Sequence, residues 1–494
     1  MEKTISVGYV PSLWIYAAMD RRDTVFLDSS MRNELGRRSY IGIRPWRIHT
    51  PEDSDAIEVL NSIGDGTLMG FLSYDYGMDL MGMGSVHGGP SWPLFALADF
   101  DIIIEDDPEE RTLEITCKGR LEDAESQMQQ VIRILKKACE PIIPEVPAPI
   151  AVEGTSERSF MDSVEEARRM EAEGSFYVVN LSRRIRVRSD ADPFDVFLRL
   201  RRASPSPYGA YAELCGIRIA SSSMELLLDV SDGTAWTRPI KGTSPRTGTA
   251  EEDRRSLEAL LSSGKDRSEL LMVTDMERND LNRFCIPGSV EVEAFYSPEE
   301  YSTLYHTVSD VTGRVPEGTG IGDMVKAMFP GGSITGAPKR ACMEAIDSLE
   351  DSRRGLYTGS IGLFSMKRTT MNIAIRTLVE SDGTVAEPVE VPFQKYAYCS
   401  DCTCKDKNHK AIQTVLADNY TDPSDGRVKG GRGDVRPGWE IFYNHYAKVK
   451  GLSSGFTYAK QMADKLRPEC GAGDSRYGSN SGAFDQLGWS TLML

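Results

Sequence analysis

The spacing of apolar and polar positions along the chain predicts a mixture of strands and amphipathic helices. Residues 98–105 and 112–118 alternate in the manner of half-buried strands, and residues 71–76 have a β-rich composition. Residues 121–138 instead place apolar side chains at helical spacing. Because strands and helices occur in blocks without strict βαβ alternation, the pattern favours an α+β fold over a doubly wound parallel sheet.

The chain after residue 155 shows the same mixture. The elements expected there are helices at residues 161–173, 251–262, 322–328 and 339–349, and strands at residues 176–187, 210–220, 224–230, 357–365 and 370–378. Residues 140–154 carry four prolines, a spacing that blocks helix and central strand and predicts an extended linker. We therefore expect an N-terminal subdomain at residues 1–140, a linker at 141–155 and a second domain at 156–386.

The composition changes near residue 386. The 494-residue chain has a formal net charge of −17, but the acidic excess falls within residues 1–386, and residues 387–494 are nearly neutral. The later segment is therefore expected to be a foreign tail of irregular or helical structure.

The overall charge excludes some classes of partner. An acidic field repels phosphodiester backbones and anionic lipids, so neither nucleic acid nor a membrane is an expected partner. The sequence has no apolar run long enough to cross a membrane and starts with no signal-peptide pattern. Single cysteines in apolar contexts suit a reducing compartment, so we expect a cytoplasmic protein.

A glycine-rich segment precedes the helix expected at residues 339–349. It reads Gly-Gly-Ser333-Ile-Thr335-Gly336-Ala337. Small residues at the start of a helix let backbone N–H groups approach an anion, and the hydroxyls of Ser333 and Thr335 add donors. The alternative is a Gly-rich loop before a capped helix, without a ligand.

A lysine and a glutamate are candidates for acid–base and nucleophilic chemistry. Lys241 precedes a Gly-Thr turn, and a lysine becomes a nucleophile when burial or a neighbouring cation disfavours its ammonium form. Arg238 and Arg246 are the candidate cations. Glu225 stands in an apolar and hydroxylic run, which predicts a buried, protonated carboxyl suited to general acid catalysis. A solvated turn lysine and a surface glutamate are the alternatives.

Four further residues have recognisable chemistry. Asp266 and Glu269 share one face of a predicted helix, and their oxygens suit Mg²⁺, although an exposed charged helix has the same pattern. His306 is one of five histidines, and a structural hydrogen bond is the simpler role for it. Arg376 ends a predicted apolar strand, where its guanidinium can pair with a ligand carboxylate or with an acidic side chain.

Taken in order, these segments resemble the chorismate-utilising enzymes, specifically component I of aminodeoxychorismate synthase and of anthranilate synthase. The resemblance covers about residues 1–380 and implies an anthranilate synthase component I-like α+β fold, with two β-rich subdomains flanked by helices around one pocket. The matching motifs are Phe71-Leu-Ser-Tyr-Asp-Tyr, Tyr177-Val-Val-Asn180, Arg238-Pro-Ile-Lys241-Gly-Thr, Asp275-Met-Glu-Arg-Asn279-Asp280, His306-Thr-Val-Ser, Gly331-Gly-Ser-Ile-Thr335-Gly, Arg354-Gly-Leu-Tyr357-Thr-Gly and Ala374-Ile-Arg376-Thr377.

The resemblance implies a Mg²⁺-dependent amination of chorismate at C4 to 4-amino-4-deoxychorismate, on the route to p-aminobenzoate and folate. A separate glutaminase subunit would supply the ammonia. Lys241 marks the aminodeoxychorismate branch, because anthranilate synthases usually have alanine there. In the family mechanism Lys241 attacks C2 while Glu225 protonates the departing C4 hydroxyl, after which ammonia enters at C4 and the lysine leaves.

Two alternatives stay open. The first is anthranilate synthase component I of tryptophan biosynthesis, and the second is a catalytically impaired chorismate-binding remnant. The isochorismate branch is not expected, because Val178 stands where that branch carries a water-activating lysine.

The resemblance also assigns residues to the pocket. His306 is counted with Lys241 and Glu225 as catalytic, and Glu269 matches a glutamate that binds Mg²⁺. The residues that match positions contacting chorismate are Ser333, Thr335, Gly336, Ala337, Tyr357 and Arg376.

Past the Arg376 strand the sequence departs from the family pattern. Residues 379–393 replace an expected Gly-Ala-Gly-Ile-Val turn, and no acidic helix with a second metal-binding glutamate follows. We therefore expect weak Mg²⁺ binding and weak turnover. Residues 435–494 weakly resemble the C-terminal end of an alginate-lyase-type domain, a fragment too small for that activity. The group Cys399, Cys402, Cys404 and His409 could bind zinc, but free thiols are favoured.

Overall fold

The chain folds into two compact units, each assembled from segments that lie far apart in the sequence. The first unit contains Met1–Pro144, Phe197–Thr335 and Arg353–Thr377, and the second contains Glu145–Val196, Gly336–Ser352 and Leu378–Leu494. The structure, a computed structural model, describes residues 2–31, 35–89, 92–146, 150–189, 191–246, 248–381 and 438–447.

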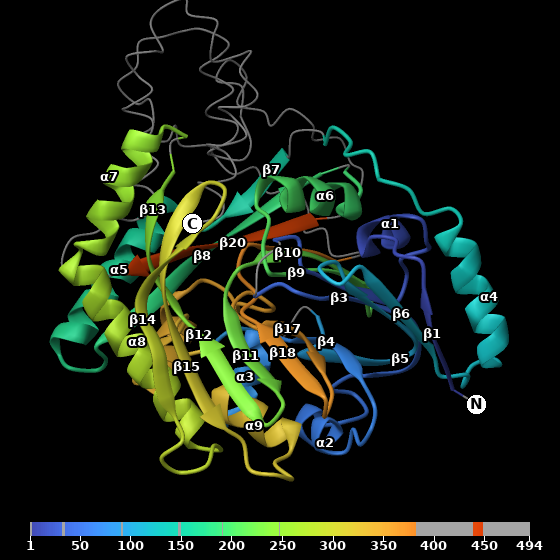
Figure 1. Cartoon of the computed structure of the whole chain (residues 1–494). Coiled ribbons are helices and arrows are strands. Elements are labelled where there is room, and N and C mark those ends of the chain that lie inside the picture. The colour runs from blue at the N-terminus through green and yellow to red at the C-terminus, as the bar shows by residue number, and fades with distance from the viewer. Residues whose placement is uncertain are drawn as a thin grey trace, which may run out of the picture. The chain divides into compact units, whose positions relative to one another are not determined.

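The first unit is built around antiparallel strands. Its strands are β1 (Lys3–Val7), β2 (Thr24–Asp28), β3 (Ser39–His49), β4 (Leu68–Leu72), β5 (Phe95–Asp107), β6 (Thr112–Cys117), β9 (Tyr208–Leu214), β10 (Ile217–Ser223), β11 (Leu226–Ser231), β12 (Thr234–Arg238), β13 (Ile240–Pro245), β14 (Glu291–Glu300), β15 (Leu304–Arg314), β17 (Ser360–Phe364) and β18 (Arg368–Asn372). Long β5 pairs with β3, β4 and β6. From β4 the pairing continues through β17, β18, β11 and β12 to β15, which also pairs with β13 and β14 (Figure 1).

Helices cover parts of these strands. The helices of this unit are α1 (Ser12–Ala17), α2 (Ala56–Asn61), α3 (Tyr74–Leu80), α4 (Ala124–Leu135), α7 (Ala250–Leu261), α8 (Gly264–Asn282) and α9 (Ile321–Met328), and α6 (Pro193–Ala203) runs across the change of unit. The side chain of Ser263 caps α8 by accepting a hydrogen bond from the backbone N–H of Asp266. Helices α7 and α8 pack beside β13, β14 and β15, and β13 is the strand that carries Lys241 (Figure 1).

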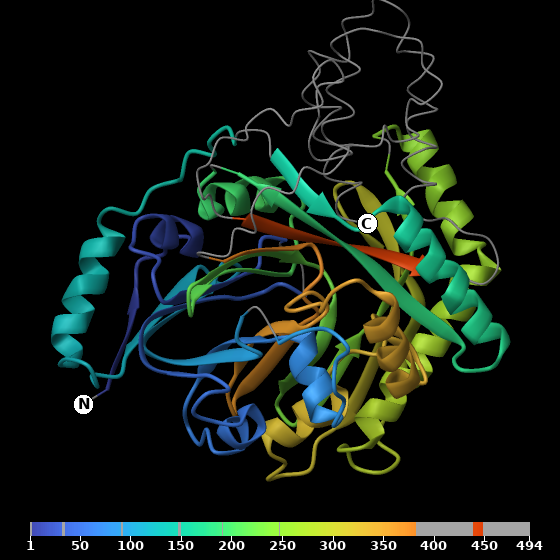
Figure 2. The ribbon, with the colours of Figure 1, turned by 180° about the vertical axis from the view of Figure 1, so that it is seen from behind.

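The second unit is centred on one long strand. Its elements are β7 (Ile150–Gly154), β8 (Val178–Arg188), β16 (Gly336–Ala337), β20 (Gly438–Ala447), α5 (Glu157–Ala172) and α10 (Lys339–Leu349), and β19 (Thr377–Ser381) starts at the last residue of the first unit. Strand β8 pairs antiparallel with β7, β16 and β20, and α5 lies along it (Figure 2).

The α+β class is confirmed, and most of the expected elements are present. Segment 71–76 is divided, because β4 ends at Leu72 and the Ser73 side chain then caps α3 by accepting from the N–H of Tyr76. Segment 370–378 is also divided, since β18 ends at Asn372 and β19 begins at Thr377. The linker expected at 141–155 ends in strand β7.

The expected domain boundaries stay a prediction, although one change of unit, after Pro144, falls inside the proline-rich segment. In the tail, residues 438–447 form a strand, which corrects the expectation of irregular or helical structure there. The segment with the three clustered cysteines lies outside the described residues, as does most of the lyase-like fragment. Within the described ranges, no helix is both long and apolar enough to span a bilayer.

Candidate active site

Lys241 is buried and points to the glycine-rich loop. Its Nζ donates a hydrogen bond to the carbonyl oxygen of Ser333 at 2.6 Å, and only 7% of the residue is exposed. The register of β13 against β15 shifts between Ile240 and Thr243, and Gly242 has φ +88°. Such a bulge changes the direction of neighbouring side chains, and it lies directly after Lys241, whose side chain faces the interior.

Glu225 lies beside Lys241, in the turn between β10 and β11. It is 4% exposed, and its Oε1 accepts a hydrogen bond from the backbone N–H of Ile240 at 3.4 Å. Burial raises the pKa of its carboxyl, and the Lys241 charge and the Ser333 hydroxyl only partly oppose this shift. The expected burial of Glu225 is confirmed. The group can therefore hold a proton next to an amine.

The two arginines expected as cations beside Lys241 have carboxylate partners instead. Arg238 pairs with Asp310 and lies 3.8 Å from a carboxylate oxygen of Glu299. Arg246 pairs with Glu300 at 2.9 Å and with Asp253 at 3.4 Å. Because these ion pairs compensate both guanidinium charges, neither arginine is a free cation that would disfavour the lysine ammonium. This corrects the expectation drawn from their proximity in sequence.

His306 is held by the bulge that also presents Lys241. Its Nδ1 lies 3.0 Å from the Thr243 hydroxyl and 3.3 Å from the carbonyl oxygen of Gly242. Burial, and then the charge of Arg376, lower the pKa of His306 to about 3, so the ring is neutral at pH 7. Within the described part of the chain, its Nε2 has no hydrogen-bond partner. The predicted structural hydrogen bond is present, and the second nitrogen is left for a ligand.

Arg376 is a half-buried cation between two strands. It does not end a strand as expected, but sits in the β18–β19 connection with φ +50°. Its Nη1 donates to the Ser204 hydroxyl at 2.9 Å, and no carboxylate among the described residues pairs with it. Burial lowers its pKa to about 10, so it remains charged at neutral pH. An anionic ligand would satisfy this charge.

The glycine-rich loop is buried, and one of its two hydroxyls donates its hydrogen bond within the loop. Ser333 and Thr335 are buried, but the Thr335 hydroxyl donates to the carbonyl oxygen of Gly331 at 2.9 Å. Its proton is therefore used inside the loop and is not directed to an anion. Gly336 and Ala337 follow in the second unit, where they form β16 and pair with β8.

Tyr357 lies on a buried arginine that sequence reasoning had not selected. The guanidinium carbon of Arg354 is 5.5 Å from the centre of the Tyr357 ring, and both residues are 2% exposed. The Arg-Gly-Leu-Tyr motif, which contains Arg354, could have indicated this residue. Its burial points to a specific role, because arginine is almost never fully buried unless it is paired.

Glu269 stands half-buried on α8, the helix that packs against β13. Asp266, one turn earlier, has its Cβ 3.1 Å from the place that a Cβ on Gly242 would take. Within the described residues, no group of three or more His, Cys, Asp and Glu side chains is arranged to hold a metal ion. A single carboxylate fits Mg²⁺ only if water and substrate complete the coordination.

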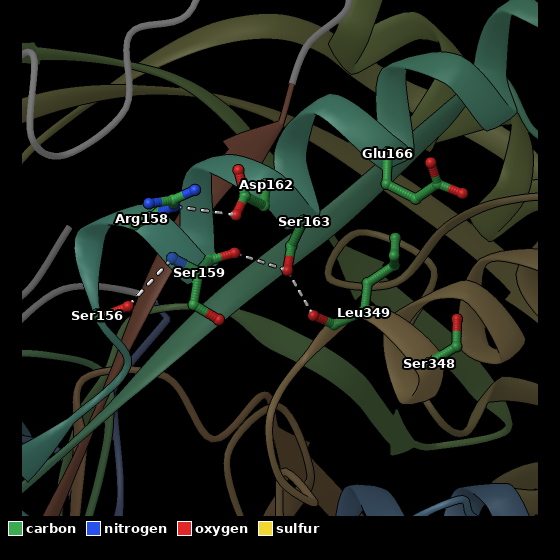
Figure 3. A pocket seen from close by; sticks show the side chains of 8 residues that line it. All are labelled: Ser156, Arg158, Ser159, Asp162, Ser163, Glu166, Ser348 and Leu349. Atoms are coloured by element: carbon green, nitrogen blue, oxygen red, sulfur yellow. Dashed lines mark hydrogen bonds and ion pairs between the residues drawn. The ribbon is translucent and has the colours of Figure 1, made fainter.

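A shallow hollow of about 470 Å³ opens in the second unit, between α5 and the end of α10 (Figure 3). Its lining residues are Ser156, Arg158, Ser159, Asp162, Ser163, Glu166, Ser348 and Leu349. Ser163 bridges two backbone carbonyls, and the Arg158–Asp162 pair is exposed at 3.9 Å. No nucleophile here is paired with a base, so this hollow is not the candidate active site.

Comparison with known proteins identifies the family of the chain. Residues 33–387 match the family described as chorismate binding enzyme. The chain therefore belongs to the chorismate-binding enzyme family.

Individual relatives carry two different names. The chain is 37% identical over 330 residues to an anthranilate synthase component 1 of Haloarcula marismortui, covering 63% of this chain and 67% of that protein. It is also 37% identical over 328 residues to the aminodeoxychorismate synthase component 1 of Bacillus subtilis, covering 64% and 70%. With a second Haloarcula marismortui anthranilate synthase component 1 it shares 43% over 227 residues, 46% of this chain and 45% of that protein. The chain thus spans about half to two thirds of the length of these relatives.

Solved structures share the fold. Anthranilate synthase component I of Streptococcus pneumoniae superposes with a TM-score of 0.66 at 19% identity, over 93% of this chain and 97% of that one. The menaquinone-specific isochorismate synthase of Escherichia coli gives 0.64 at 12% identity, over 100% and 95%.

Proposed function

We propose that the chain is aminodeoxychorismate synthase component I and aminates chorismate at C4. The observation that carries the proposal is the buried pair of Lys241 and Glu225, in a chain of the chorismate-binding family. An amine and a protonated carboxyl in one dry site provide a nucleophile and a general acid together.

The proposed reaction proceeds through a lysine adduct. The free amine of Lys241 bonds to C2 of the ring while the Glu225 carboxyl gives its proton to the departing C4 hydroxyl, which leaves as water. Ammonia then bonds to C4 and the lysine departs from C2. The site is suited to this sequence because burial raises the pKa of the Glu225 carboxyl, which favours the protonated form that a general acid needs.

Other residues of the cluster would bind and orient chorismate. Arg376 offers its charge to a substrate carboxylate, and the neutral His306 offers a ring nitrogen to a substrate hydroxyl. Tyr357 and the loop from Ser333 to Thr335 would close the remaining sides.

Mg²⁺ is proposed as the cofactor, with Glu269 as one ligand. The metal would neutralise a second substrate carboxylate, which is the chemistry that it supplies when bound. The described residues contain no group of three or more His, Cys, Asp and Glu side chains arranged to hold a metal ion, and we propose that the substrate and water supply most of the coordination and that metal binding is weak.

Ammonia is proposed to come from a glutaminase subunit. The support is the name of the relatives, "component 1", which implies a second component. Free ammonium would replace this partner in the test below.

Anthranilate synthase component I is the second candidate, because relatives of equal identity carry that name. Incubation with chorismate, ammonium and Mg²⁺, followed by chromatography, separates 4-amino-4-deoxychorismate from anthranilate. The proposal predicts the first product from the native chain and neither from Lys241→Ala. Anthranilate as the main product would overturn the assignment.

A binding remnant is the third candidate, favoured by the departure from the family pattern after residue 386. Isothermal titration of chorismate with and without Mg²⁺ distinguishes it. Tight binding without any product would show that the chain is a remnant.

A further inference from the structure

Arg354 is the largest side chain that is fully buried in the described part of the first unit. Its guanidinium lies 4.8 Å from the Tyr74 ring centre and 5.5 Å from that of Tyr357, so it stacks on two aromatic faces. Cation–π contacts of this kind stabilise a charge that has left water. Burying an arginine costs desolvation free energy unless its donors form hydrogen bonds. The groups that accept from Arg354 are therefore the groups that it fixes in position.

One of these contacts is made to the glycine-rich loop, which also accepts a hydrogen bond from Lys241. Nη1 of Arg354 donates to the carbonyl oxygen of Ile334 at 3.2 Å, while Lys241 donates to the preceding carbonyl, that of Ser333. Lys241, which precedes this short loop in the sequence, and Arg354, which follows it, thus donate hydrogen bonds to two successive carbonyls of the loop.

The same guanidinium nitrogen also holds the segment of Tyr357. It donates to the Thr358 hydroxyl at 3.2 Å, and that hydroxyl donates to the carbonyl oxygen of Tyr357 at 2.6 Å. The backbone N–H of Thr358 donates to Ala374 at 2.9 Å, two residues before Arg376. Arg354 therefore contacts the segments that carry Ser333 and Tyr357, and the backbone of the second segment is hydrogen-bonded to the segment that carries Arg376.

We propose that Arg354 is a positioning residue of the candidate active site, which fixes the Ser333–Ile334 carbonyls and thereby the place of the Lys241 amine. It does not touch substrate, and it acts through Ile334 and Thr358. The proposal deepens the proposed function and rests on it only for the substrate readout, because the placement of Lys241 can be measured without chorismate.

The test measures the reactivity of Lys241 in the folded chain. Native protein, Arg354→Met and Arg353→Met are treated briefly with an acylating reagent, and the modification of Lys241 is followed by peptide mass spectrometry. Methionine fills similar volume without the charge or the donors. Arg353 is the matched control, because its Nε donates at 2.6 Å to the Gly88 carbonyl, away from the loop.

Loss of the Arg354 contacts removes the Nη1 hydrogen bond to the Ile334 carbonyl, and we expect Lys241 to be modified about tenfold faster, with the control unchanged. Chorismate affinity should fall by about the same factor, as expected for a displaced binding group. An unchanged Lys241 rate in folded Arg354→Met would overturn the proposal, even if the melting temperature fell. Absence of chorismate binding by the native chain would instead count against the proposed function, since the lysine readout is independent of it.

Thr358→Val covers the case in which Arg354→Met does not fold. It keeps the guanidinium and the side-chain shape but removes the hydroxyl that Arg354 holds, so we expect about a threefold faster modification of Lys241. No change in this variant would overturn the proposal.

Discussion

The amine of Lys241 and the guanidinium of Arg354 hold adjacent carbonyls, those of Ser333 and Ile334, at 2.6 and 3.2 Å. These two buried side chains therefore fix the loop at adjacent residues. Glu225 stands beside Lys241, and its titration gives the sharpest predictions.

Glu225→Gln should lower turnover and raise stability at alkaline pH. The amide keeps the shape but has no proton to give, so we expect kcat to fall by about 10² to 10⁴. The raised carboxyl pKa means that the folded state holds its proton more tightly than the unfolded state, whose value is near 4.5. This contribution to stability is complete below pH 4.5 and is lost as the pH rises through the folded pKa. The stability gain of Glu225→Gln over the native chain should therefore grow from pH 4.5 upward in chemical denaturation.

The contribution of His306 to the stability of the fold should have the opposite dependence on pH. Its folded pKa of about 3 lies below the unfolded value of 6.5, so the neutral ring stabilises the fold above pH 6.5, and that contribution is lost as the pH falls toward 3. His306→Asn keeps a polar group near Thr243 without the titration. We expect the native chain to lose up to about 1.4 kcal/mol per pH unit more than this variant between pH 6 and 4. Parallel stability curves in urea would contradict the assignment of a buried neutral ring.

Arg376 should determine affinity for the substrate carboxylate. Arg376→Lys keeps the charge but not the planar fork, and Arg376→Met removes both, so titration should give losses in chorismate affinity of about tenfold and about a hundredfold. Ser204→Ala removes only the internal partner of the guanidinium and should change the affinity by less than about threefold. A chorismate affinity of Arg376→Met equal to that of the native chain would show that Arg376 does not bind the substrate carboxylate.

Gly336 tests the packing of β16 on β8. Its φ is +127°, and a Cβ there would lie 2.0 Å from the carbonyl oxygen of Val178. Gly336→Ala should therefore lower the free energy of unfolding by about 3 kcal/mol, since the strands must separate. Gly174→Ala is the matched control, because it has φ +85° with open space around it, and its cost should be only about 1 kcal/mol of backbone strain. Similar losses in both variants would mean that the clash contributes nothing.

The spacing of apolar and polar residues predicted many of the helices and strands correctly. The helix predicted at 339–349 is α10 (Lys339–Leu349), and the alternation predicted at 112–118 is β6 (Thr112–Cys117), whose exposed and buried residues alternate. These elements have a clear period and nothing that interrupts it. The burial of Glu225 also followed, because its neighbours are apolar along the chain itself.

The errors concern interactions between distant residues. Arg238 is near Lys241 in sequence, but its partner Asp310 lies 72 positions away on a neighbouring strand. The strand expected through Arg376 is broken by a left-handed backbone, which no hydrophobic pattern signals. Arg354 belongs to the Arg-Gly-Leu-Tyr motif, but its burial between two aromatic rings depends on Tyr74 of α3, far away in the sequence.

Lys241 is proposed to be the nucleophile toward chorismate, and a covalent adduct on this residue would demonstrate that role. The native chain is incubated with chorismate and Mg²⁺ in the absence of ammonia, and the modified peptides are mapped by mass spectrometry. We expect an adduct of chorismate less one water on Lys241, which disappears when ammonium is added and does not form in Glu225→Gln. Formation of 4-amino-4-deoxychorismate by Lys241→Ala at the native rate, with no adduct in the native chain, would contradict it.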